Sequence, residues 1–175
     1  MTARVLYVLV RFPKLSETFV LEEMLALEAA GWLVGVDALE APLGEPRDPA
    51  LARLRARVRL LPERPPPARL LATHLSLAAR RPRAWARAAR RARSEGRVRD
   101  FLRAGLIAAR AVREGADLIH VHFAYYSAEY ARDAAELAGI PFTVFAHAND
   151  IWAEFNEPHL ARRLGGAAGV GTPTR

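Results

Sequence analysis

The sequence predicts one α/β domain, a doubly wound, mostly parallel sheet with helices on both faces and a helical segment rich in arginine. Short apolar runs of strand length alternate with longer amphipathic stretches along the chain. With 175 residues, 51% of them hydrophobic, the chain can bury the core of a single domain. Strands separated by helices pair in parallel through right-handed crossovers, which place helices against both faces.

The first forty residues predict a strand–helix–strand unit. Residues 4–10 are an apolar run typical of a buried strand, and residues 11–15 form the loop after it. Ser16 is placed to cap a helix that ends near Gly31, because a serine hydroxyl accepts from free N–H groups and glycine tolerates the turn after a helix. Residues 32–39 then supply the second strand.

The middle of the chain is expected to be mainly helical. Prolines, glycine and charges mark a loop over residues 40–48, and a weak strand follows at residues 58–61. Alanine, leucine and arginine dominate residues 68–114, which predicts a basic helical tract within the domain. Pro82 and residues 94–96 should divide this tract into two or three helices.

The last third predicts strands at residues 117–123, 142–146 and 168–172, separated by helices over residues 127–137 and 158–164. The second of these strands runs directly into a histidine and, three residues later, an aspartate. Parallel sheets bind ligands outside the carboxyl ends of their strands. The sequence therefore places a candidate site at this end of the sheet.

Composition excludes several classes of protein. Cysteine is absent, which rules out disulfides, thiolate metal sites and a cysteine nucleophile, and favours a reducing compartment such as the cytoplasm. The apolar run at residues 5–10 is too short for a signal peptide or a membrane span. A net charge of +7 and a pI near 10.8 raise the question of a polyanionic or membrane partner.

The loop after the first strand is a candidate anion site. Backbone N–H groups at a helix start and the side chains of Arg11, Lys14, Ser16 and Thr18 could converge on a negatively charged ligand. Alternatively, Ser16 only caps the helix and Lys14 is solvated. The chain has no Gly-x-Gly-x-x-Gly fingerprint and no P-loop.

Two strand ends carry histidines. His120 and His122 lie two residues apart and so face the same side, and His147 with Asp150 could complete a ligand set for a metal-dependent hydrolase. Alternatively, His120 is a hydrogen-bonded core residue, while His122 at the strand end reaches solvent or ligand. His147 is placed to donate to a polar ligand such as a sugar. Asp150 either binds a second hydroxyl or joins Asn149 in satisfying backbone donors of a turn.

The basic tract allows three interpretations. Nucleic acid would use its charge for phosphate contacts, and an anionic membrane would contact Arg87, Arg90 and Arg91 with Trp85 at the headgroup level. The third interpretation is a solvated helix face in a chain that prefers arginine. The nine arginines are Arg80, Arg81, Arg83, Arg87, Arg90, Arg91, Arg93, Arg97 and Arg99. No recognised nucleic-acid-binding motif accompanies them, so a nucleic-acid partner is not expected.

Three ordered blocks, residues 11–19, 120–124 and 139–152, resemble the N-terminal half of family-four retaining glycosyltransferases. The likeness is strongest to the branch that builds exopolysaccharides and capsular sugars. It covers essentially the whole chain and is weakest between residues 40 and 114. It implies a GT-B architecture, in which two Rossmann-like domains enclose a cleft and the N-terminal one mainly holds the acceptor.

The resemblance also implies roles for individual residues. His147 resembles the cleft histidine beside the donor sugar and Asp150 its motif partner, so these are the expected catalytic residues. The loop with Ser16, Glu17 and Thr18 resembles the first βα loop, which lies near the donor phosphates. Retaining members are thought to transfer the sugar with help from the departing diphosphate, which makes stabilisation of that diphosphate the main protein contribution.

The remaining expected contacts are with substrate. His122 and Phe123 would border the acceptor, and Arg11, Lys14 and Asn149 are further candidate contacts. The co-substrate is a nucleotide sugar, the acceptor a glycan or lipid-linked glycan, and neither a metal nor a tightly bound cofactor is expected.

The sequence departs from the family pattern on the donor side. In such enzymes, the donor domain supplies a basic pair and a motif with acids eight positions apart, and no two glutamates here have that spacing. We therefore expect an acceptor-side domain without its C-terminal donor-binding domain, with little or no transferase activity alone. A domain that faces a partner across a cleft can expose apolar surface, through which two copies of the chain could associate.

Overall fold

The computed structural model of the chain describes residues 2–44, 48–152 and 157–173. The strands are β1 (Arg4–Arg11), β2 (Leu33–Glu40), β3 (Arg57–Leu60), β4 (Leu118–His122), β5 (Phe142–Phe145) and β6 (Gly169–Gly171). The helices are η1 (Leu15–Glu17), α1 (Thr18–Ala29), η2 (Pro49–Arg53), α2 (Pro67–Arg80), α3 (Pro82–Ser94), α4 (Val98–Glu114), α5 (Tyr126–Ala138), α6 (Ala148–Trp152) and α7 (Glu157–Leu164). The predicted α/β fold and its alternation of strands and helices are confirmed.

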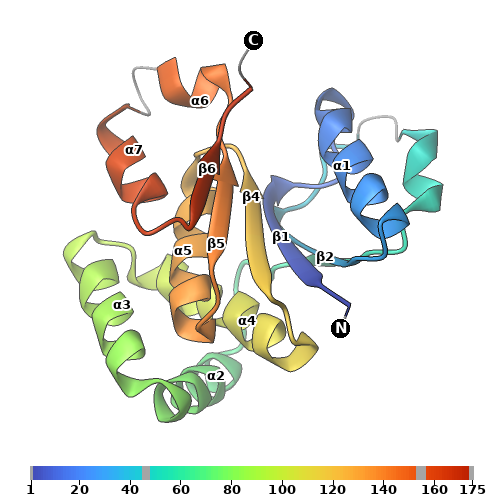
Figure 1. The fold of residues 1–175 in the computed structure, drawn as a ribbon. Helices are drawn as coiled ribbons and strands as arrows, with labels where there is room; N and C mark the ends of the chain where they lie inside the picture. Colours follow the sequence, from blue (N-terminus) through green and yellow to red (C-terminus); the bar gives the residue numbers. More distant parts are fainter. Residues whose placement is uncertain (1, 45–47, 153–156, 174–175) are drawn as a thin grey trace.

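The six strands form one parallel sheet in the order β3-β2-β1-β4-β5-β6 (Figure 1). The sheet grows outward from β1 in one direction and then from β4 in the other, which is the Rossmann-like doubly wound arrangement. The direction reverses between β1 and β4, where Tyr7 lies opposite His120. On the other side of β4, His120 lies opposite Thr143 and His122 opposite Phe145. His120 and His122 of β4 therefore lie at the switch point of the sheet.

Helices cover both faces of the sheet (Figure 1). On one face, α1 packs its buried Val20, Leu21 and Met24 against β1 and β2. On the other face, α4 and α5 pack against the sheet, with α2 and α3 outside them. The larger core lies on this second face, where small alanines let the helices approach closely.

The prediction that Ser16 caps the first helix is wrong. Residues Leu15–Glu17 form a 3-10 turn, and α1 begins only at Thr18. Neither start has a side-chain cap, and Ser16 is exposed. The physical reason is local, because Lys14 accepts from the Glu17 N–H through its carbonyl and pairs with the Glu17 carboxylate through its ammonium at 2.5 Å. These contacts close a tight turn before the helix starts.

The helical tract divides where predicted. The α2 helix ends at Arg80, α3 starts at Pro82, and Gly96 adopts a left-handed φ of 69° before α4. The side chain of Trp85 is held within the protein, because its Nε1 donates to His74 Nδ1 at 3.0 Å and its ring contacts Phe101. It is not free to insert among lipid headgroups. The tryptophan therefore joins the three helices of the tract.

Much of the positive charge of the tract is neutralised inside the fold. Arg91 pairs with Asp133 at 2.7 Å and with Glu136 at 2.7 Å, and Arg87 pairs with Glu136 at 2.9 Å. Arg97 is buried and also contacts Asp133, at 3.1 Å. Of the three arginines considered for membrane contact, two hold α3 against α5. Arg90 is exposed and has no ion pair among the described residues.

Within the described residues, no helix combines the length and apolar character needed to cross a membrane.

Candidate functional site

A cluster of polar side chains lies at the switch point, on the face of the sheet that α1 covers. Glu23 of α1 reaches over β1 and β4 and lies 3.6 Å from His120 Nε2 and 3.3 Å from His122 Nε2. The Tyr7 hydroxyl donates to Glu23 Oε1 at 2.5 Å. His120 is fixed from its other side, because Nδ1 lies 2.7 Å from Thr143 Oγ1. We call Tyr7, Glu23, His120 and His122 the switch-point cluster.

The electrostatics of this cluster favour an anionic glutamate. Burial alone would raise the pKa of Glu23, but its contacts with His122 and Tyr7 outweigh burial and lower the pKa to about 2. Burial, reinforced by the neighbouring His122, lowers the pKa of His120 to about 4 despite the attraction of Glu23. Burial and the glutamate together raise the pKa of Tyr7. Near neutral pH, Glu23 is charged while His120 and Tyr7 are neutral.

The prediction that His122 reaches solvent is wrong, whereas His120, predicted to be a hydrogen-bonded core residue, is hydrogen-bonded to Thr143 but only partly buried. His122 is only 2% exposed, although it is the last residue of β4. The rings of Phe19, Phe145 and His147 surround it, with centroids 5.6, 5.7 and 5.8 Å from its own. The strand end is covered because α1 projects Phe19 over it, which the strand pattern alone does not reveal.

His147 follows β5 and lies against aromatic rings. Its ring centroid is 4.6 Å from Phe123, 4.9 Å from Phe19 and 5.2 Å from Phe145. Burial and the nearby His122 lower its pKa, although Asp150 and two glutamates partly oppose them. The imidazole is half-buried, and its Nε2 has no hydrogen-bond partner among the described residues. Nε2 is also shielded from solvent, so a polar ligand would reach this imidazole only after neighbouring side chains move.

Phe123 adopts an unusual backbone conformation beside His147. Its φ of 70° lies in the left-handed region, which costs free energy for a side chain as large as phenylalanine. The Phe123 N–H donates to the Phe145 carbonyl at 2.8 Å, so the ends of β4 and β5 remain joined after the last paired residue. Strain of this kind concentrates at binding sites, which favours a role for Phe123 in positioning the aromatic surface.

Asp150 fixes the two strand ends. It is fully buried, and its Oδ2 accepts from the backbone N–H of Ala124 and of His147, each at 2.9 Å. The second bond is the acid half of a capping box, because His147 precedes the first residue of α6 and Asp150 is the third. The expected role in satisfying backbone donors is confirmed for Asp150. The side chain of Asn149 lies outside the described part of the structure.

Replacing Asp150 with alanine should lower the free energy of local opening at this end of the sheet by about 1–3 kcal/mol, because two backbone N–H groups lose their acceptor. Hydrogen exchange by NMR should detect faster exchange at the Ala124 and His147 amides than in the unchanged protein. Asparagine is the matched control, since it keeps one acceptor oxygen and should preserve part of the protection. Unchanged exchange in the alanine variant would contradict this role.

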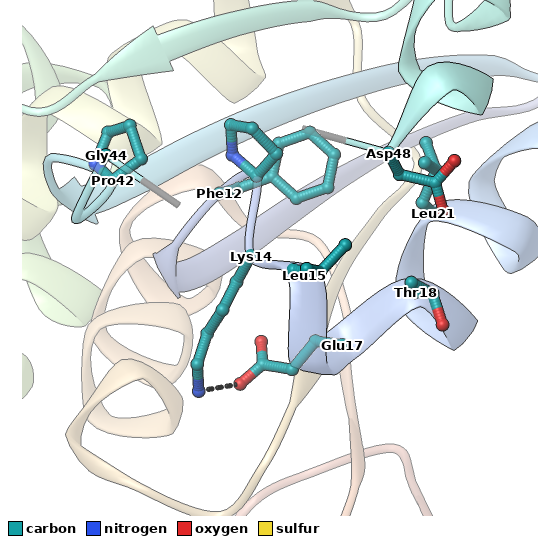
Figure 2. A pocket seen from close by; sticks show the side chains of 10 residues that line it. Phe12, Lys14, Leu15, Glu17, Thr18, Leu21, Pro42, Gly44 and Asp48 are labelled. Carbon is teal, nitrogen blue, oxygen red and sulfur yellow. Dashed lines mark hydrogen bonds and ion pairs between the residues drawn. The ribbon is translucent and has the colours of Figure 1, made fainter. Parts of the chain in front are cut away.

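The loop after β1 contributes charges that already have partners. Arg11 forms an ion pair with Glu40, and Lys14 pairs with Glu17. Beside them lies a cavity of about 220 Å³, mostly apolar in its lining (Figure 2). The described lining residues are Phe12, Pro13, Lys14, Leu15, Glu17, Thr18, Leu21, Pro42, Gly44 and Asp48. None of the histidines lines this cavity, although its lining residue Glu17 lies close enough to His147 to act on the pKa of that imidazole.

The structure brings together residues that the sequence did not connect. Glu23 and Tyr7 were not among the predicted site residues, yet both contact the histidines. The signal for Glu23 was its spacing four residues after Phe19, which places both side chains on one face of α1.

The structure does not bring together the four residues considered as the ligand set of a metal-dependent hydrolase. Among the described residues, the ligand atoms that lie within 4.8 Å of one another belong to Glu23, His120 and His122. Asp150 uses one carboxylate oxygen for backbone donors, and His147 contacts the set only through its ring against His122.

Comparison with other proteins gives no independent assignment. No model of a known protein family matches this chain, and no curated protein sequence matches it. The function must therefore be inferred from the geometry of the site and from the motifs of the chain.

Proposed function

We propose that this chain is the acceptor-side domain of a retaining sugar transferase, which moves a sugar from a nucleotide-sugar donor to a glycan or lipid-linked acceptor. One observation carries the proposal: Phe123 and His147 lie together just beyond the carboxyl ends of neighbouring strands, above the buried His122 at the switch point. Doubly wound folds bind ligands at this place. Two of the three ordered sequence blocks that resemble family-four glycosyltransferases contribute these residues.

The chemistry of the site suits a sugar. Phe19 and Phe123 flank His147, and aromatic rings can pack against the apolar face of a sugar ring. His147 Nε2 is buried and has no hydrogen-bond partner among the described residues, so it would exchange a hydrogen bond with a sugar hydroxyl only after the surrounding side chains move aside. Asp150 then acts as a positioning residue, since its bond to the His147 N–H fixes the backbone that carries the imidazole.

The first loop is the proposed contact with the donor phosphates. Arg11 and Lys14 supply positive charge beside Ser16 and Thr18, which are exposed. Binding a diphosphate would require these two cations to release or share their present partners, Glu40 and Glu17. The exposed fractions of the Arg11 and Lys14 side chains, 34% and 36%, leave room for such an exchange. No protein nucleophile is assigned, and stabilisation of the departing diphosphate is the main contribution.

Binding of sugars to the surface formed by Phe123 and His147 tests the proposal. The purified chain is titrated with a panel of mono- and oligosaccharides, free and as short-chain lipid diphosphates, and followed by NMR. We expect resonances of Phe123 and His147 to move for at least one glycan. Substituting His147 with alanine should weaken that binding about tenfold, the equivalent of 1.4 kcal/mol for one lost ring contact and hydrogen bond.

The matched control is His159→Ala, which removes a histidine on α7 and should leave glycan affinity unchanged. With UDP- or GDP-linked hexoses added, we expect little or no transfer by this chain alone. Failure of every glycan to bind, or equal binding by the His147→Ala variant, would contradict the proposal.

A further inference from the structure

The side chains of Glu23, His120 and His122 have the composition and spacing of a metal-ligand set. Two imidazoles from alternate positions of β4 and one carboxylate from α1 place their donor atoms within 4.8 Å of one another. The two nitrogen–oxygen separations, 3.6 Å from His120 Nε2 to Glu23 Oε1 and 3.3 Å from His122 Nε2 to Glu23 Oε2, are close to the distance of about 3.3 Å between ligands around tetrahedral zinc. The donor atoms therefore need little movement to surround one ion.

The histidines also have unused nitrogens. His122 is almost fully buried, yet neither ring nitrogen has a hydrogen-bond partner among the described residues, and the same holds for Nε2 of His120. Both Nε2 atoms face Glu23 closely enough for attraction, but without the geometry of a hydrogen bond. Leaving buried polar atoms unsatisfied is unfavourable, and an ion between the two rings would satisfy both Nε2 atoms.

We propose that Glu23, His120 and His122 bind one divalent transition-metal ion, with Zn²⁺ as the best match. Two imidazoles and one carboxylate are a ligand set that zinc accepts, whereas magnesium and calcium prefer oxygen donors alone. Three protein ligands leave a fourth position for water or a ligand oxygen. The Glu23 side chain is 39% exposed, so this position can communicate with solvent.

Neighbouring side chains hold the ligands in orientation. Thr143 contacts Nδ1 of His120, which leaves Nε2 to face the ion, and the Tyr7 hydroxyl holds one oxygen of Glu23. Such outer contacts fix the tautomer of a histidine ligand and the angle of a carboxylate. The Glu23 carboxylate also contributes a charge-bearing oxygen ligand of the kind that attracts a divalent cation.

This inference does not rest on the sugar-transfer proposal, and the two can fail separately. The purified chain is freed of metal with a chelator, dialysed, and titrated with Zn²⁺ by calorimetry and with Co²⁺ by visible absorption. We expect one equivalent to bind and Co²⁺ to give the intense bands of low-coordinate nitrogen and oxygen ligation. Zn²⁺ should also raise the midpoint of thermal unfolding, because the ion binds only the folded chain.

Variants distinguish a metal site from a simple hydrogen-bonded cluster. Glu23→Gln and the double variant His120→Gln/His122→Gln should abolish saturable binding, while Tyr7→Phe should weaken it about tenfold, as loss of an outer contact does. His159→Gln is the matched control and should bind like the unchanged chain. The proposal is overturned if the unchanged chain shows no saturable binding, or if Glu23→Gln binds as tightly as the unchanged chain. Because the first result needs no variant, a folding defect cannot obscure it.

Discussion

Replacing Asp37 with asparagine is expected to lower the free energy of unfolding by about 3–5 kcal/mol, the cost of leaving buried charges unpaired. Asp37 lies in the centre of β2 and is fully buried. Arg59 donates to both its oxygens, at 2.7 and 2.6 Å, and Arg110 donates to Oδ1 at 2.6 Å. Burial alone would lower the pKa of Arg110, but Asp37 and Glu114 raise it on balance, so its guanidinium stays charged.

Urea unfolding followed by circular dichroism measures this change. The matched control is Glu63→Gln, because the Glu63–Arg99 pair is exposed and should contribute about 0–1 kcal/mol. Replacing Asp37, Arg59 and Arg110 together with leucine, leucine and methionine should recover most of the loss, because the charges of this group are then all removed. A loss below 1 kcal/mol in the asparagine variant would show that the two guanidinium groups find other partners.

Replacing Asp133 with asparagine is expected to lower the free energy of unfolding by about 3 kcal/mol and to weaken the packing of α3 on α5. Asp133 is fully buried and accepts from Arg91 at 2.7 Å and from Arg97 at 3.1 Å, with Arg132 at 3.4 Å beside it. Asparagine keeps the shape but removes the negative charge that these guanidinium groups share. The cost arises because Arg97 is itself buried and cannot regain water without local opening.

Thermal unfolding and hydrogen exchange across α3 measure the effect of Asp133→Asn. Glu136→Gln is the matched control on the same helix, since its partner Arg87 is largely exposed and Arg91 keeps Asp133. The control should cost well under half as much. Equal losses in the two variants would mean that the position on α5, rather than burial of the charge, determines the effect.

Most of the fold could be predicted from the sequence because its local signals agree. Apolar runs at residues 4–10 and 142–146 predicted β1 and β5 almost to their ends, and Pro82 marked the break between α2 and α3. The start of α1 was missed because the pairing of Lys14 with Glu17 closes a 3-10 turn ahead of it. Competition of this kind between neighbouring side chains has no periodic signal.

The site was harder to predict, because it depends on contacts between elements far apart in the chain. The end of β4 marked His122, but only the position of α1 shows that Phe19 covers it and that Glu23 lies against it. The arginines of α3 likewise looked solvated, since their acidic partners lie on α5. Glu129, Asp133 and Glu136 follow helical spacing and were a signal for a matching basic face.

The ionic contacts of α5 have a consequence for heating. Glu129 and Asp133 together collect guanidinium groups from α3, from Arg97 ahead of α4, and from Arg162 and Arg163 of α7. Water solvates charged groups less favourably as temperature rises, so the desolvation penalty of ion pairs falls on heating. A network of ion pairs therefore contributes more to stability at high temperature than isolated pairs contribute at 25 °C. The helices that these ion pairs join should therefore be among the last parts of the molecule to unfold on heating.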